Sequence, residues 1–261
     1  MKIFKIILFM GISCFLVSFS PVQTHRRSAF RDTTWTANSA VLSAQDSTLV
    51  AYWKAEGISD SKGSHTLTNV GTATYTAGKY NNALTLNGSS QYFTAVDDSD
   101  FDYGSGEFTI ACWFNRSATG VDHNIYHQLA NVGQYASPVT IQITSGNKLK
   151  ILTSTNGTSW TTTGEGSTTI NATTWYHLVI VGDGTDIKGY INDSLEVTLA
   201  SVGTLFNATQ VVELGAYTYS GGTVNHFNGQ LDELAVWKGY GADSAFISAL
   251  YNSGTGSFYL P

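Results

Sequence analysis

The feature that most constrains this chain is a succession of short runs rich in Val, Ile, Tyr, Phe, Trp and Thr, separated by clusters of Gly, Asn, Ser and Asp. β-Branched and aromatic residues favour strands, and dipeptides such as Asn87-Gly88 and Asp183-Gly184 supply turns between them. The Thr-rich residues 153–174 contain Trp160 and Ile170, which favours a hairpin over a linker. The pattern predicts an all-β, antiparallel sandwich, with strands at Leu49–Trp53, Ala83–Leu86, Gln91–Ala95, Glu107–Asn115, Ile125–Ala130, Val139–Thr144, Leu149–Thr153, Trp175–Val181, Ile187–Ile191, Leu195–Thr198, Val211–Leu214 and Gln230–Trp237.

One helix is expected, close to the C-terminus. Asp243 is a typical N-cap residue, and Gly254 is a typical helix stop. Between these two positions, the apolar side chains that would share one face of the helix are Phe246, Ile247, Leu250 and Tyr251. We therefore expect a short amphipathic helix that packs against the sandwich.

The N-terminus predicts export. Lys2 and Lys5 precede an apolar run at residues 6–19, which as a helix would span only about 21 Å of a hydrocarbon core of about 30 Å. A basic start followed by such a run is typical of a secretory signal peptide. We expect a signal peptide at residues 1–24, a polar lead-in at residues 25–47, and a secreted, extracellular or cell-surface protein with no membrane span in its mature part. An uncleaved N-terminal anchor is the alternative.

Charge and cysteine content exclude several classes of protein. Charged residues make up 12% of the chain and the net charge is −6, so no basic surface for nucleic acid is expected. Cys14 lies in the expected signal peptide, which leaves Cys112 without a disulfide partner. Because Cys112 lies in the apolar run 108–114, we expect a buried and unreactive thiol.

Several segments of the chain follow the motif order of one protein family. Phe108–Trp113 resembles the motif F-T-I-x-x-W, and Phe227–Trp237 resembles F-x-G-x-I-D-E-V-x-I-W. The other matching segments are 49–56 with 60–63, 78–88 with 91–93, 175–179 with 189–193, where Asp193 replaces the usual turn glycine, and 245–254. In these segments the chain resembles laminin-G-like (LamG) domains of the concanavalin A-like lectin/glucanase superfamily. The resemblance implies a jelly-roll β-sandwich at residues 48–261 whose first and last strands pair, with one short C-terminal helix.

The resemblance also implies one structural Ca²⁺ ion, because related domains hold one. Asp232 lies among apolar residues, so its carboxylate is expected to be buried and to need a partner. If the first and last strands pair, Asp60 comes near it, and Glu56, Asp60 and Asp232 would supply the oxygen ligands that Ca²⁺ prefers. Hydrogen bonds to Asp232 from the backbone amides of a neighbouring turn are the alternative.

The densest acidic segment is residues 97–104. Asp98, Asp100 and Asp102 imitate the first three ligand positions of an EF-hand loop. Tyr103 stands where that loop needs glycine, and Thr109 stands where it needs glutamate. We therefore expect a solvated polar loop here and not an EF-hand.

The sequence does not predict an enzyme. Glycosidases of this superfamily need two carboxylates at a set separation, whereas Asp232 and Glu233 are adjacent and would point to opposite faces of a strand. His177 follows the aromatic residues Trp175 and Tyr176 in an expected strand, where a core or edge histidine is expected rather than a catalytic base. The motifs G-x-S-x-G and H-E-x-x-H are absent from the sequence.

Aromatic residues of the predicted loops favour binding instead. A sugar ring stacks on an exposed aromatic face, and amide, imidazole and carboxylate groups bind its hydroxyls. The candidate ligand-binding residues are Tyr217, Tyr219, Asn225, His226 and Trp160; a second group combines Tyr126 and His127 with Asp122 and Asn124. Packing on a sheet edge is the alternative for each of them. We expect a secreted, non-catalytic module that binds a polysaccharide or glycoconjugate, or an adhesion module. The alternative is a structural or interaction protein, such as a phage or surface-fibre component that contacts a surface protein.

Overall fold

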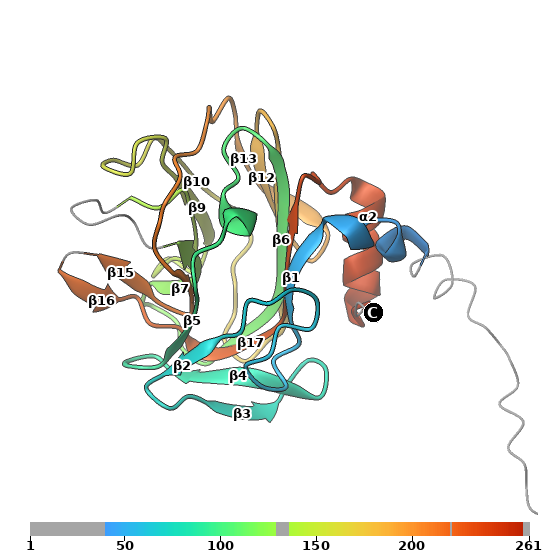
Figure 1. The fold of residues 1–261 in the computed structure, drawn as a ribbon. Helices are drawn as coiled ribbons and strands as arrows, with labels where there is room; N and C mark the ends of the chain where they lie inside the picture. Colours follow the sequence, from blue (N-terminus) through green and yellow to red (C-terminus); the bar gives the residue numbers. More distant parts are fainter. Residues whose placement is uncertain (1–39, 129–135, 220, 258–261) are drawn as a thin grey trace, which may run out of the picture. The chain divides into compact units, whose positions relative to one another are not determined.

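The computed structural model describes residues 40–128, 136–219 and 221–257 (Figure 1). These residues form two large antiparallel sheets. The eight-stranded sheet has the order β13-β12-β11-β6-β17-β4-β3, with β1 paired to β17. Its strands are β1 (Leu49–Trp53), β3 (Thr74–Ala77), β4 (Asn82–Asn87), β6 (Glu107–Arg116), β11 (Tyr176–Asp183), β12 (Ile187–Ile191), β13 (Ser194–Leu199) and β17 (Asn228–Lys238).

The second large sheet has seven strands in the order β10-β9-β8-β7-β14-β5-β2. Its strands are β2 (Thr68–Val70), β5 (Tyr92–Ala95), β7 (His123–Gln128), β8 (Val139–Ile143), β9 (Leu149–Thr153), β10 (Thr162–Glu165) and β14 (Val212–Leu214). A separate two-stranded sheet pairs β15 (Tyr217–Tyr219) with β16 (Gly222–Val224). This hairpin follows β14 directly and extends from the side of the seven-stranded sheet (Figure 1).

The main core lies between the two large sheets. Alternate residues of their strands point into it, and Phe93, Phe114, Ile141 and Leu178 are fully buried there. Apolar burial stabilises a fold by roughly 25 cal/mol per Å², so this single layer of side chains accounts for the association of the sheets.

A second apolar cluster lies under helix α2 (Ser244–Tyr251), which covers the outer face of the eight-stranded sheet (Figure 1). The Phe246 ring meets the Trp237 ring edge to face at 5.3 Å. Asp243 caps the helix, because its Oδ1 accepts a hydrogen bond of 2.8 Å from the Phe246 amide. β6 and β11 are therefore buried on both faces.

The sequence predicted this architecture well. The all-β sandwich, the capped helix and the pairing of β1 with β17 are confirmed, and each expected strand occurs, although residues 129 and 130 lie outside the described part of the chain. Strands β2, β3, β15 and β16 were not predicted, and β10 completes the expected Thr-rich hairpin with β9. Cys112 is buried, and burial raises the pKa of its thiol.

The expected signal peptide and most of the lead-in lie outside the described residues. Within the described part of the chain, no helix has both the length and the apolar composition that crossing a membrane requires.

Candidate functional site

Three aromatic side chains predicted to bind a ligand lie together. The rings of Tyr217 and Tyr219 are nearly parallel, with centroids 5.7 Å apart, and the ring of Trp160 lies 6.4 Å from that of Tyr217. Trp160 and Tyr217 are half-buried, and Tyr219 is 38% exposed. We call Trp160, Tyr217 and Tyr219 the aromatic group. Its partly exposed rings have the character of a stacking surface.

The aromatic group is supported by the outer face of the seven-stranded sheet. In β7, Tyr126 belongs to the main core and the next residue, His127, points to the opposite face. The edge of the Tyr217 ring meets the His127 ring at a centroid distance of 4.5 Å. His127 Nδ1 lies 2.9 Å from Thr140 Oγ1, and burial lowers the pKa of His127 to about 3. Tyr217 therefore rests on a neutral, fixed imidazole.

A buried carboxylate fastens the hairpin that carries the two tyrosines. Glu213 lies opposite His127 in the β14–β7 register and is only 2% exposed. Its carboxylate accepts hydrogen bonds from the Thr218 amide at 2.9 Å and from Thr218 Oγ1 at 2.6 Å. Burial raises the pKa of Glu213. Because Thr218 lies between Tyr217 and Tyr219, these bonds fix where both rings project.

The two remaining predicted ligand-binding residues, Asn225 and His226, have other contacts. His226 faces the ring of Tyr92 in β5 at a centroid distance of 5.9 Å. Asn225 has a left-handed backbone (φ 52°), and its carbonyl accepts a hydrogen bond from the Asn124 amide. The Asn225 backbone therefore joins this loop to Asn124. Among the described residues, the structure shows no ring contact between His226 and the aromatic group.

The second group that the sequence proposed does not form a loop. Tyr126 and His127 both lie in strand β7, and Tyr126 is fully buried with its hydroxyl 2.9 Å from Tyr103 Oη. The supporting residues His127, Glu213 and Thr218 were not identified as a unit from the sequence. The one signal in the sequence was the position of Glu213 between apolar residues of β14, which indicates that its side chain points away from the main core.

The structure does not place ligand atoms of Glu56, Asp60 and Asp232 within 4.8 Å of one another. Asp60 accepts hydrogen bonds from the amides of Tyr52, Lys62 and His65, and Glu56 accepts two from Asn82. Within the described ranges, no group that could hold a metal ion contains any of these three carboxylates. Calcium binding by these three residues therefore stays a prediction.

Asp232 follows the alternative that the sequence left open. Its Oδ2 accepts a hydrogen bond from the Tyr80 amide at 2.9 Å, in the turn before β4. Burial raises the pKa of Asp232 to about 7, although the backbone hydrogen bonds lower it. The buried carboxylate thus has backbone donors from a neighbouring turn.

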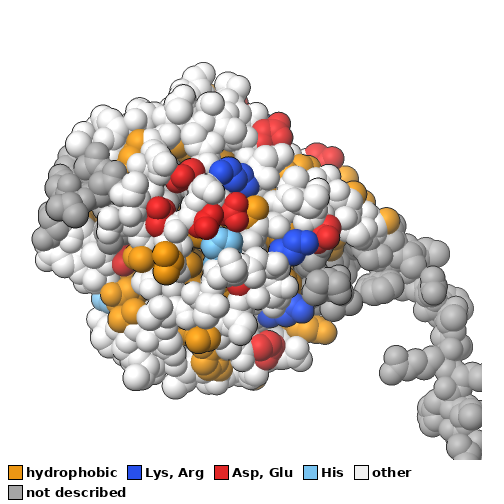
Figure 2. All heavy atoms as spheres, viewed as in Figure 1, with side chains coloured by type: hydrophobic (Ala, Val, Ile, Leu, Met, Phe, Trp, Pro, Cys, Tyr) orange, Lys and Arg blue, Asp and Glu red, His pale blue; other side chains and the backbone are white. Residues whose placement is uncertain are grey.

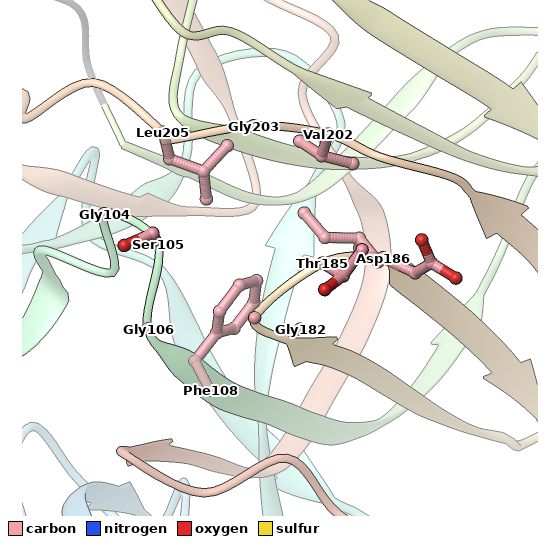
Figure 3. Close-up of a pocket in the computed structure, with 12 residues that line it drawn as sticks. Gly104, Ser105, Gly106, Phe108, Gly182, Thr185, Asp186, Val202, Gly203 and Leu205 are labelled. Atoms are coloured by element: carbon pink, nitrogen blue, oxygen red, sulfur yellow. The ribbon is translucent and has the colours of Figure 1, made fainter.

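A separate pocket lies where the chain before β6 meets the β11–β12 turn and residues 202–205. Figure 3 shows Phe108, Val202 and Leu205 around it. Asp186 is the one charged residue in the described lining, and its Oδ1 accepts a hydrogen bond from the Ser201 amide. The pocket has one aromatic ring and few polar groups, so the aromatic group is the better candidate for a binding site.

The sequence matches one family model, that of the concanavalin A-like lectin/glucanases superfamily, over residues 87–240. This range runs from the last residue of β4 beyond the end of β17 and contains the aromatic group with its supporting residues. A search of curated proteins found no match.

Solved structures share the fold at low sequence identity. The binding domain of Paraclostridial Mosquitocidal Protein 1 has a TM-score of 0.65 and 15% identity, over 80% of this chain and 53% of that one. A second structure is domain 4 of AbnA, a GH43 extracellular arabinanase from Geobacillus stearothermophilus, in complex with arabinotriose. It has a TM-score of 0.60 and 18% identity, over 80% of this chain and 98% of that one. A third structure is of botulinum neurotoxin type C, whose cell entry is described as dependent on interaction with two ganglioside molecules. It has a TM-score of 0.63 and 14% identity, over 81% of this chain and 52% of that one. The chain spans about half the length of the mosquitocidal and neurotoxin chains.

Proposed function

Because this chain belongs to the concanavalin A-like lectin/glucanases superfamily, we propose that it is a secreted, non-catalytic module that binds a polysaccharide or glycoconjugate through Trp160, Tyr217 and Tyr219. The fold is that of a lectin-like binding domain. The observation that carries the proposal is the gathering of three partly exposed rings, from two distant segments, on a rigid support. Neighbours of this fold described with arabinotriose and gangliosides support a sugar as the ligand.

The chemistry of the group favours an uncharged glycan. The rings present apolar faces, on which the C–H side of a pyranose stacks. The Glu213 carboxylate is buried and accepts hydrogen bonds from Thr218, the residue between the two tyrosines, so it offers no surface charge to a ligand. With 12% charged residues in the whole chain, stacking and hydrogen bonds would dominate recognition over ion pairs.

The absence of hydrolysis is part of the same proposal. A glycosidase needs two carboxyl groups that reach its substrate. Asp232 and Glu233, the adjacent pair, are 1% and 7% exposed. Asp232 bonds to the Tyr80 amide, and Glu233 accepts a hydrogen bond from the Tyr52 hydroxyl. Both carboxylates are thus engaged inside the protein, which supports a binding role.

The test is affinity electrophoresis through gels that contain a panel of neutral and acidic polysaccharides. We expect at least one polysaccharide to retard the wild-type protein, and Tyr219→Ala to weaken that binding by roughly 5- to 150-fold, since loss of a stacking ring costs about 1–3 kcal/mol. The control is Tyr80→Ala, which removes a tyrosine that is 42% exposed in the turn before β4 and should leave retardation unchanged. Absence of retardation by every polysaccharide would favour the structural or interaction module instead.

Secretion has its own test. The basic and then apolar start of the chain motivates the proposal. Intact-mass measurement of protein recovered outside the cells should show a chain that lacks about the first 24 residues. Recovered protein that still begins at Met1 would contradict it.

A further inference from the structure

A buried histidine and two aspartates form a second cluster, away from the aromatic group. His65, Asp98 and Asp100 each offer one ligand atom, and these atoms lie within 4.8 Å of one another. His65 comes from the loop between β1 and β2, whereas the aspartates come from the segment between β5 and β6. On the face shown in Figure 2, acidic side chains gather beside a histidine.

The imidazole of His65 is held in one orientation. Its Nδ1 lies 3.0 Å from Asp60 Oδ2, its ring meets Phe101 at 4.8 Å, and its carbonyl accepts a 2.6 Å hydrogen bond from the Trp53 indole. A Cβ on Gly63 would lie 2.8 Å from both Asp60 Oδ2 and His65 Nδ1. The tight approach of this loop therefore depends on glycine at position 63.

The other ring nitrogen has no hydrogen bond. The His65 side chain is 7% exposed, and its Nε2 is buried without a hydrogen-bond partner among the described residues. The nearest carboxylate oxygen, Asp100 Oδ2, lies 3.4 Å away. A buried nitrogen that lies at ion-pair distance from one carboxylate and makes no hydrogen bond is not explained by the packing of the loop.

We propose that His65 Nε2, Asp98 and Asp100 bind a divalent transition-metal ion of the zinc class, with Asp60 as the positioning residue that orients the imidazole. Asp60 on Nδ1 leaves the Nε2 lone pair for the metal, which is the arrangement usual for histidine ligands. Ligand atoms around zinc lie about 3–4 Å apart, because the bonds are about 2.0–2.2 Å, so the cluster is close to this spacing. The nitrogen ligand favours this class over Ca²⁺, which takes oxygen ligands.

The charges around the cluster are compatible with a cation. The Asp100 amide donates to Asp98 Oδ1 at 3.0 Å, and this hydrogen bond fixes the Asp98 carboxylate within the cluster. The nearby Lys238 ammonium donates to the Ser99 carbonyl. This site has no residue in common with the aromatic group, and it differs from the predicted calcium trio except that Asp60 now orients a ligand.

The test is isothermal titration calorimetry of the tag-free, EDTA-treated protein with Zn²⁺ alone. We expect one Zn²⁺ ion per chain, and Asp100→Asn to weaken binding at least tenfold. The Asp100 side chain is 37% exposed, so this variant should fold. Asp98→Asn should act in the same direction, and Asp60→Asn should weaken binding about 10- to 100-fold, as loss of an orienting partner does.

The matched control is Asp193→Asn, which removes an acid in the turn between β12 and β13 and should leave Zn²⁺ affinity unchanged. Thermal melts of each metal-free variant verify folding. Absence of Zn²⁺ binding, wild-type affinity in Asp100→Asn, or a site that takes Ca²⁺ and not Zn²⁺ would each overturn the proposal.

Discussion

Glu233→Gln is expected to remove a pH dependence of stability that the structure builds into β17. Glu233 is 7% exposed, accepts a hydrogen bond from the Tyr52 hydroxyl and lies beside Asp232. Burial raises its pKa from 4.5 to about 8. In the unfolded chain the carboxyl ionises near its ordinary pKa, so between these two values the folded state binds more protons than the unfolded state.

The sign and size follow from that difference. Stability from Glu233 is fully present below about pH 4.5 and is lost as the pH rises toward 8. One pKa unit corresponds to about 1.4 kcal/mol, so the loss is on the order of a few kcal/mol and at most about 5 kcal/mol. Asp232, whose pKa burial raises to about 7, acts in the same direction.

The assay is urea unfolding between pH 5 and pH 9. Glutamine keeps an acceptor for the Tyr52 hydroxyl and cannot ionise, so Glu233→Gln and wild type should have similar free energies of unfolding at pH 5. At pH 8.5 the variant should be the more stable, by roughly 2–5 kcal/mol. Glu165→Gln, on exposed β10, is the control and should keep the wild-type slope. Parallel pH profiles for wild type and Glu233→Gln would show that Glu233 does not cause the pH dependence.

Three further outcomes are expected. Asp243→Ala removes the cap that accepts from the Phe246 amide and should lower the free energy of unfolding by about 1 kcal/mol in urea titrations, whereas Asp243→Ser should restore most of it. Thr218→Val removes the hydroxyl bonded to Glu213 and should weaken polysaccharide retardation while the melting temperature falls by only a few degrees; unchanged retardation would contradict the fastening role of this bond. Cys112 should react with a thiol reagent only after unfolding, because it is buried and its thiol pKa is raised, and rapid labelling of the native protein would be the opposite result.

Strands β2, β3, β15 and β16 were not predicted for a common physical reason. Thr68–Val70 and Thr74–Ala77 are short and contain no fully buried residue, so they lack the long apolar runs by which β6 and β11 are found. The hairpin of β15 and β16 has three residues in each strand, and its pairing depends on the side-chain bonds of Thr218 to Glu213 and Thr223. Contacts of this kind leave no periodic signal.

The adjacent acids of β17 show where strand alternation fails. Strict alternation places Asp232 and Glu233 on opposite faces, but Leu231 and Leu234 both point into the main core. A bulge between Asp232 and Ala235, with Glu233 at φ 50°, inserts one residue. Both acids therefore lie between two core-facing leucines, and the predicted opposite orientation was wrong.

The sequence also identified some residues of the two candidate sites and missed others. The sequence identified Tyr217 and Tyr219 because they share one short segment, and it named Trp160 without indicating that its ring would reach Tyr217. His65 was not singled out, since its partners Asp98 and Asp100 come from a distant loop that the sequence marked only as polar. Proximity between separate loops depends on how the sheets stack, which local patterns do not encode.

Sugar binding by Trp160, Tyr217 and Tyr219 can be tested by a ¹H–¹⁵N chemical-shift titration with a soluble oligosaccharide from whichever polysaccharide retards the protein. We expect the indole N–H of Trp160 and the amides of Tyr217, Thr218 and Tyr219 to shift together and to saturate at one affinity. Shifts confined to the opposite side of the molecule, around Trp237 and helix α2, with the Trp160 indole unmoved, would contradict it.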